Sequence, residues 1–137
     1  MTGDKNSDYE KAGFDGTLVP GFKPVLLIID PARAYIDPEC PLYAGVEDVA
    51  QNIVHLKGVA SARGIPVIVT RVLHDDKALN GGVFVRKVPS LKWLRPESPF
   101  SAYIEGLSPT GNDIKVVKQY ASAFSGTTLA ATLTAMG

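Results

Sequence analysis

Two side chains of opposite charge, Asp30 and Lys118, stand where acid–base chemistry could take place. Asp30 directly follows an aliphatic run that begins at Val25, and Lys118 ends a later run, residues 114–118. In an open parallel sheet, ligands bind beyond the carboxyl ends of the strands, so both side chains are expected at one rim. Thr70 is expected there too. A carboxylate and an ammonium group that converge on one cleft could deprotonate a nucleophile and hold it as an anion.

The same two residues also allow a simpler interpretation. Asp30 could cap the turn that follows its strand, and Lys118 could be a surface charge. Phosphotransferases also place an aspartate after a first strand, in a D-x-D motif, but here Pro31 and Ala32 follow the aspartate. No G-x-G-x-x-G or Walker sequence is present, which argues against a dinucleotide-binding or P-loop protein.

Several other side chains could contribute to a site. Tyr35, five residues after Asp30, could form a wall of a substrate pocket or simply pack under its loop. Residues 74–112 form the least regular stretch of the sequence. Its aromatic residues could line a lid or a subunit contact, or anchor the loop; they are Trp93, Phe100 and Tyr103. Three cations could meet a substrate carboxylate, although a solvated charge is the favoured interpretation for each: Arg71, Arg86 and Lys87.

The candidate metal ligand and the candidate nucleophile are both weak. His74 stands beside Asp75 and Asp76 but lacks the spaced partners of a metal site, so a solvated loop is favoured and no metal is expected. The single cysteine, Cys40, lies in a proline-flanked loop and is interpreted as a packing residue rather than a nucleophile. Residue His55 is expected at the surface of a helix.

The elements that must position these side chains follow an α/β pattern. Unbroken aliphatic runs bounded by prolines or glycines are typical of strands buried on both faces of a parallel sheet, and three are expected, at residues 25–29, 65–70 and 114–118. A helix with a stripe of apolar residues should connect the first two in a right-handed crossover, and a second should run over residues 127–136. The stripe consists of Val46, Val49, Ile53, Leu56 and Ala60.

These elements predict an N-terminal arm, residues 1–23, followed by the N-terminal part of one α/β domain, residues 24–137. The three strands should have the order 3-2-1, with the remaining strands of the sheet absent. The first strand then lies at an edge although it is strongly hydrophobic, and natural edges are not left so apolar. We therefore expect a second chain, a symmetry mate or a C-terminal half to cover it.

The bulk composition excludes several partners. The 14 basic and 14 acidic residues cancel, so neither nucleic acid nor an anionic membrane surface is an expected partner. The N-terminal residues are polar and lack the apolar core of a signal peptide, and the longest aliphatic run is far too short to span a bilayer. A cytoplasmic location is expected.

Six sequence blocks resemble the isochorismatase-like cysteine hydrolases, in the branch of the N-carbamoylsarcosine amidases and maleamate amidohydrolases. The blocks cover residues 9–14, 21–24, the strand that ends at Asp30, the D-P-x-x-P-L-Y loop at 37–43, and K-V-P at 87–89 together with K-x-x-A-S-A-F-x-G-T-x-L at 118–129. The resemblance implies an aspartate–lysine–cysteine triad on a parallel sheet, in which Asp30 matches the general base and Lys118 the lysine. It also implies hydrolysis of a small linear amide or N-carbamoyl compound without an organic cofactor, in a homo-oligomer.

The chain departs from the family pattern in one respect. The family's nucleophilic cysteine follows the next strand, which has no counterpart before Gly137. By the resemblance, this chain carries two members of the triad, and a second chain or a C-terminal half would supply the third. The alternatives are a binding subunit of the same fold without catalysis, and a fragment with no activity of its own.

Overall fold

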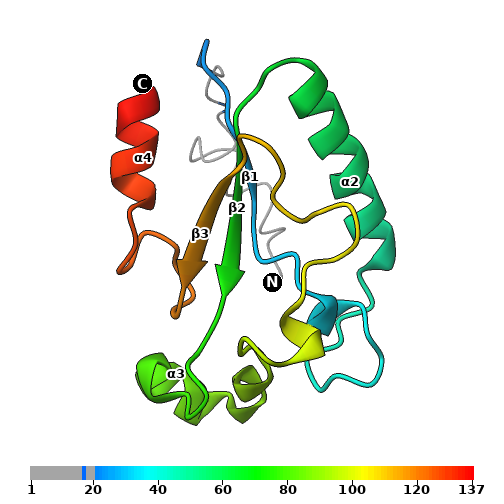
Figure 1. The fold of residues 1–137 in the computed structure, drawn as a ribbon, viewed down its shortest axis with the longest axis vertical. Coiled ribbons are helices and arrows are strands. Elements are labelled where there is room, and N and C mark those ends of the chain that lie inside the picture. Colours follow the sequence, from blue (N-terminus) through cyan, green and yellow to red (C-terminus); the bar gives the residue numbers. More distant parts are fainter. Residues whose placement is uncertain (1–16, 18–20) are drawn as a thin grey trace, which may run out of the picture.

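A three-stranded parallel sheet lies between helices in the computed structural model, which describes residue 17 and residues 21–137 (Figure 1). The strands are β1 (Leu26–Ile28), β2 (Val67–Val72) and β3 (Ile114–Lys118), in the order β1-β2-β3. Both the α/β fold class and the 3-2-1 strand order are confirmed. Most of the predicted N-terminal arm lies outside the described residues, and the division at residue 23 stays a prediction.

Helices cover the two faces of the sheet separately. Helix α2 (Glu47–Ala62) packs on one face and helix α4 (Leu129–Met136) on the other, as Figure 1 shows. Because side chains alternate along a strand, β2 sends Val67 and Val69 towards α2 and Ile68 towards α4. Apolar side chains are therefore required on both faces here, which is why residues 67–69 of β2 are all aliphatic.

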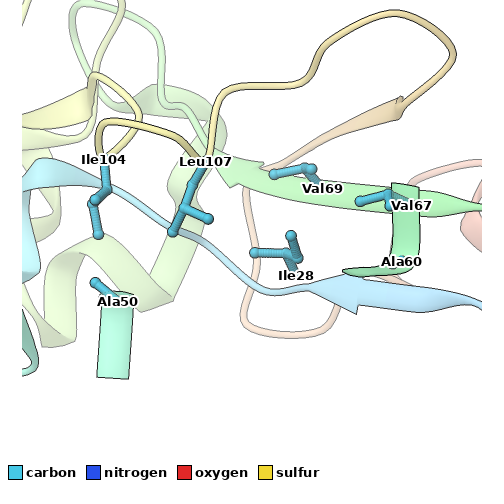
Figure 2. Close-up of a cluster of buried hydrophobic side chains, with 7 residues drawn as sticks. All are labelled: Ile28, Ala50, Ala60, Val67, Val69, Ile104 and Leu107. Atoms are coloured by element: carbon cyan, nitrogen blue, oxygen red, sulfur yellow. The ribbon is translucent and has the colours of Figure 1, made fainter. Parts of the chain in front are cut away.

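The core between the sheet and α2 consists of small and branched apolar side chains (Figure 2). Ala50 and Ala60 let the helix approach the sheet closely, while Ile104 and Leu107 come from the segment that precedes β3. The members of this cluster are Ile28, Ala50, Ala60, Val67, Val69, Ile104 and Leu107. Burial of such side chains contributes about 1.5–3 kcal/mol for each fully buried valine, leucine or isoleucine.

The orientation of α2 differs from the prediction in part. Ala60 is buried and Ile53 packs against the core, but Val49 and Leu56 are 53% and 50% exposed. Lys57 is buried instead, because its ammonium group lies 3.0 Å from the Asp113 carboxylate and donates to the Ser108 carbonyl at 2.6 Å. This ion pair fixes the helix to the loop before β3.

The stretch predicted to be irregular contains only short helices, all near the carboxyl ends of the strands (Figure 1). They are α3 (Gly82–Lys87) and the 3-10 turns η2 (Leu79–Gly81), η3 (Pro89–Trp93) and η4 (Pro99–Ser101); a further turn, η1 (Arg33–Tyr35), follows β1. None of the helices in the described part of the chain is long and apolar enough to cross a membrane.

Backbone pairing fixes the segment after η4 beside the residues that follow β1. Tyr103 forms an antiparallel bridge with Ala32, and the Ile104 amide donates to the Pro31 carbonyl at 2.9 Å. The Arg33 amide donates to the Ala102 carbonyl, also at 2.9 Å. The side chain of Tyr103 is thereby held close to the end of β1.

Candidate active site

Asp30 and Lys118 meet at the carboxyl ends of β1 and β3. The Lys118 ammonium group lies 2.7 Å from Oδ2 of Asp30, and the two side chains are 3% and 16% exposed. Because β2 lies between β1 and β3, the pair spans the full width of the sheet. The predicted convergence of these two side chains is confirmed, and the interpretation of Lys118 as a surface charge is wrong.

Thr70 of β2 completes this arrangement. Its hydroxyl group is fully buried and donates to Oδ1 of Asp30 at 2.6 Å, while the Asp30 amide donates to the same hydroxyl oxygen at 3.1 Å. Each carboxylate oxygen of Asp30 therefore has a donor, one from the adjacent strand β2 and one from β3 beyond it.

The backbone of Asp30 is in the left-handed region, with φ of +52°. Outside glycine this conformation is uncommon, although aspartate adopts it more readily than most residues, and it costs about 1–3 kcal/mol. Ile28, two residues earlier, points towards α2, whereas Asp30 bonds to Thr70, which points to the other face. The left-handed turn thus directs the carboxylate towards Lys118.

The segment after β3 holds the lysine from its other side. The Lys118 ammonium group donates to the Ala121 carbonyl at 2.7 Å. The turn itself is closed by Thr127, whose hydroxyl donates to the Ala123 carbonyl and accepts from the Leu129 amide. The residues of the K-x-x-A-S-A-F-x-G-T-x-L block thus fix the position of the ammonium group.

Two hollows adjoin Asp30, and Tyr35 lines both of them. A groove of about 370 Å³ runs between the end of β1 and α2, with Ile53 and Leu107 among its apolar walls. A small cavity of about 10 Å³ lies on the side of Arg71 and Tyr103. Burial, with the nearby Asp30 carboxylate adding to it, raises the pKa of Tyr35, so its hydroxyl remains protonated at neutral pH. Tyr35 also packs against the apolar cluster that contains Cys40, so both interpretations from sequence describe its position, and its contact with a substrate stays a prediction.

Arg71 is not the solvated cation that its sequence context favours. Its guanidinium group lies 4.9 Å over the ring of Tyr103, and Nη2 donates to Ser101 Oγ at 3.3 Å. The expectation failed because Tyr103 and Ser101 come from a segment thirty or more residues away in the chain. Arg86 and Lys87 are exposed, as expected.

His74 is also buried rather than solvated, with 1% exposure, because residues 78–94 fold over it. Its amide donates to the Leu94 carbonyl at 2.8 Å, and a Cβ at Gly81 would lie 2.9 Å from its Nδ1. Burial lowers the pKa of His74, so the ring is neutral at pH 7. Within the part of the chain that the structure describes, no three His, Cys, Asp or Glu side chains are grouped so that they could hold a metal ion.

Cys40 has the packing position expected for it. It is 3% exposed and belongs to an apolar cluster that includes Ala34 and Leu94. Among the remaining aromatic residues, Trp93 and Phe100 form an edge-to-face pair with ring centroids 5.7 Å apart. The sequence placed Thr70 at the rim with Asp30, where the two side chains are hydrogen-bonded. It did not indicate the contact of Tyr103 with Arg71, since no local motif records a contact across 32 residues.

Comparison with known proteins finds close sequence relatives. The chain is 38% identical over 119 residues to the maleamate amidohydrolase of Pseudomonas putida, which covers 85% of this chain and 56% of that protein. It is 30% identical over 134 residues to the N-carbamoylsarcosine amidase of an Arthrobacter species, covering 93% of this chain and 50% of the relative. The chain thus spans about half the length of the curated relatives that it matches.

Solved structures share the arrangement of strands and helices. A cysteine hydrolase from Pseudomonas syringae pv. phaseolicola superposes with a TM-score of 0.78 at 25% identity, over 89% of this chain and 60% of that one. An isochorismatase from Pseudomonas putida gives a TM-score of 0.70 at 26% identity, over 94% and 59% of the two chains. Residues 24–137 match the model of the isochorismatase domain, and the protein belongs to the isochorismatase family.

Proposed function

We propose that this chain is the acid–base part of an amidohydrolase that cleaves a small linear amide or an N-carbamoyl compound. The observation that carries the proposal is the 2.7 Å ion pair between Asp30 and Lys118 at the carboxyl rim of the sheet. The names of the two sequence relatives, a maleamate amidohydrolase and an N-carbamoylsarcosine amidase, support an amide as the substrate.

The proposed mechanism uses a cysteine thiol from outside this chain. Asp30 takes the proton of the thiol, and Lys118 stabilises the thiolate that forms. The thiolate attacks the amide carbon, the carbon–nitrogen bond breaks, and the amine or ammonia leaves with the proton that Asp30 returns to it. Water then attacks the thioester while Asp30 accepts its proton, which releases the carboxylic acid and restores the thiol.

We further propose that a second chain or a C-terminal segment brings this cysteine to the free edge of β1. Ile29 at this edge is 65% exposed, and the apolar side chains Val49 and Leu56 of α2 are exposed as well. An uncovered apolar edge of this kind invites pairing with another strand. A strand that paired in parallel with this edge of β1 would end beside Asp30, which directly follows Ile29.

Replacing either charged residue tests the proposal. The chain is co-expressed with the C-terminal part of the Pseudomonas putida maleamate amidohydrolase that lies beyond the matched region, and ammonia release from maleamate and N-carbamoylsarcosine is measured. Asp30→Asn should lower kcat/KM by about 100- to 10,000-fold because it removes a general base. Lys118→Ala should do so as well, since the thiolate loses its counter-ion.

The matched controls are Asp48→Asn and Lys115→Ala, which make the same changes at exposed positions of α2 and β3. Both should retain full activity. Circular dichroism and thermal unfolding identify variants that lose activity because they unfold, a real concern for Lys118→Ala since it leaves a carboxylate unpaired. Full turnover in a folded Asp30→Asn assembly would remove Asp30 from the mechanism.

A second function is favoured for the chain by itself. Its one cysteine is buried in a core cluster, so the chain presents no thiol of its own at the Asp30 rim. The isolated chain should therefore bind amides without hydrolysing them. Ammonia release by the purified chain alone would contradict this assignment.

A further inference from the structure

Arg71 carries a charge that the described part of the chain does not balance. It is the last residue but one of β2, and its charged group lies over Tyr103 beside the small cavity next to Asp30. The ion pairs among the described residues involve the cations Arg33, Lys57 and Lys118, and none includes Arg71. Its Nε atom is buried and lacks a hydrogen-bond partner within the described residues.

An arginine in this state is suited to bind an anion. A buried donor without an acceptor is unfavourable, and a partly buried cation without a counter-ion is more so. Asp30 does not supply the counter-ion, because its carboxylate is paired with Lys118 and no ion pair among the described residues joins it to Arg71. The carboxylate of Asp30 balances only one of the two cations, Lys118 and Arg71, so this rim carries a net positive charge.

Tyr103 provides a second donor at the same place. Its hydroxyl oxygen is buried and also lacks a partner within the described residues. Burial raises the pKa of Tyr103, with Arg71 opposing the shift, so the hydroxyl keeps its proton at neutral pH. The backbone bridge between Tyr103 and Ala32 anchors Tyr103 beside the segment that follows Asp30. Tyr103 and Asp30 line the same small cavity.

The two hollows have sizes that suit the two parts of a short anionic ligand. The cavity of about 10 Å³ has room for about one oxygen atom or water molecule. It shares Asp30, Pro31 and Tyr35 with the groove of about 370 Å³, which can hold the body of the ligand. A ligand that places an oxygen atom in the cavity can therefore extend past Asp30 into the groove.

We propose that Arg71, assisted by Tyr103, binds a carboxylate of the substrate and so selects short amides or N-carbamoyl compounds that carry a carboxylate at their other end. The planar guanidinium group matches a carboxylate in shape and charge. This inference rests on the proposed amide hydrolysis and assigns the residue that recognises the carboxylate of its substrate.

Binding of two matched ligands to the purified chain tests the inference without turnover. Maleamate and its neutral diamide, maleamide, differ only in the carboxylate, and titration calorimetry measures each at low protein concentration. Wild-type protein should bind maleamate about 10- to 100-fold more tightly, as expected for hydrogen bonds to charged groups. Arg71→Gln should abolish this preference and leave maleamide binding unchanged.

Two further variants keep the test decisive. Arg86→Gln makes the same change at an exposed arginine outside both hollows and should retain the full preference. Arg71→Lys keeps the charge but loses the planar fork, and should reduce the preference about 10-fold. If circular dichroism shows that Arg71→Gln does not fold, Arg71→Lys provides the test in its place.

The possible failures have different readouts. Equal binding of both ligands by wild-type protein, no binding of either, or an unchanged preference in folded Arg71→Gln or Arg71→Lys would each overturn the role of Arg71. The first result is also expected if an acidic residue of a covering segment is the natural partner of Arg71. Loss of hydrolysis in the co-expressed assembly, with the maleamate preference intact, would count against the proposed function alone.

Discussion

At the scale of single residues, the carboxylate of Asp30 is held by donors from the other two strands, β2 and β3. The Lys118 ammonium group satisfies one oxygen and the Thr70 hydroxyl the other. Each oxygen keeps a further lone pair, so the carboxylate can still accept a proton while its orientation is fixed. A residue that takes no part in the chemical step, such as Thr70, can thus assist catalysis by holding the general base in position.

Replacing Thr70 by valine should separate orientation from acid–base chemistry. Thr70→Val keeps the shape of the side chain but leaves Oδ1 and the amide of Asp30 without their partner. The free energy of unfolding should fall by about 1–3 kcal/mol, and turnover of the co-expressed assembly should also fall. Thr70→Ser retains the hydroxyl and should restore turnover, as ammonia release would show. If Thr70→Val were fully active, Asp30 would need no fixed orientation.

At the scale of elements, strands were easier to predict from sequence than helix faces. The aliphatic runs gave all three strands within two residues, since burial on both faces leaves a pattern that any parallel sheet requires. The face of α2 was harder, because its core positions are held by small alanines and by a lysine whose partner, Asp113, lies far along the chain. Val49 and Leu56 were predicted to face the core because they are apolar, but both remain exposed.

The site was also predicted only in part: the residues that follow strands were placed correctly, and those that depend on long-range loop contacts were not. Asp30 and Lys118 follow strands, so parallel topology alone brings them to one rim. The environments of Arg71 and His74 depend on where residues 78–103 fold, and this irregular stretch has no periodicity from which its path could be derived.

The ion pair that fixes α2 should make stability depend on pH. Burial opposes ionisation of Asp113, but hydrogen bonds from Thr110 and Lys57, with the lysine charge, outweigh it and lower its pKa below 3.8. A carboxyl group with a lowered folded-state pKa stabilises the fold above its ordinary value, and this contribution is lost as the pH falls further. Denaturant unfolding should therefore show wild-type stability declining below about pH 4.

Asp113→Asn removes this titrating group and should be less stable than wild type at pH 7. The difference between the two proteins should shrink as the pH is lowered from 5 to 2. Asp48→Asn, at an exposed site of α2, controls for a general effect of charge. A constant difference over the whole range would show that Asp113 contributes nothing through its ionisation.

At the scale of the whole molecule, apolar surface gathers along the free edge of β1 and the adjacent side of α2. Ile29, Val49 and Leu56 are all at least half exposed. We expect the isolated chain to self-associate through this surface, since exposed apolar edges pair readily with one another.

Charged substitutions at this surface should oppose the association. Val49→Glu combined with Leu56→Glu should lower the apparent mass measured by light scattering at high protein concentration, and should weaken capture of the co-expressed C-terminal segment. Val83→Glu is the matched control, because Val83 is 67% exposed on α3 at another place in the fold. Equal effects of the two changes would mean that charge alone, and not this edge, governs association.

The three polar side chains at the rim come from all three strands, and this has a consequence for how the protein acquires its chemistry. Thr70 lies 40 residues from Asp30, and Lys118 belongs to the last strand. Closing such long loops is entropically costly and comes late in folding. An intermediate with only β1 and β2 paired would already hold the carboxylate against the hydroxyl but would lack the ammonium group, so chemical competence can arise only once the final strand has docked.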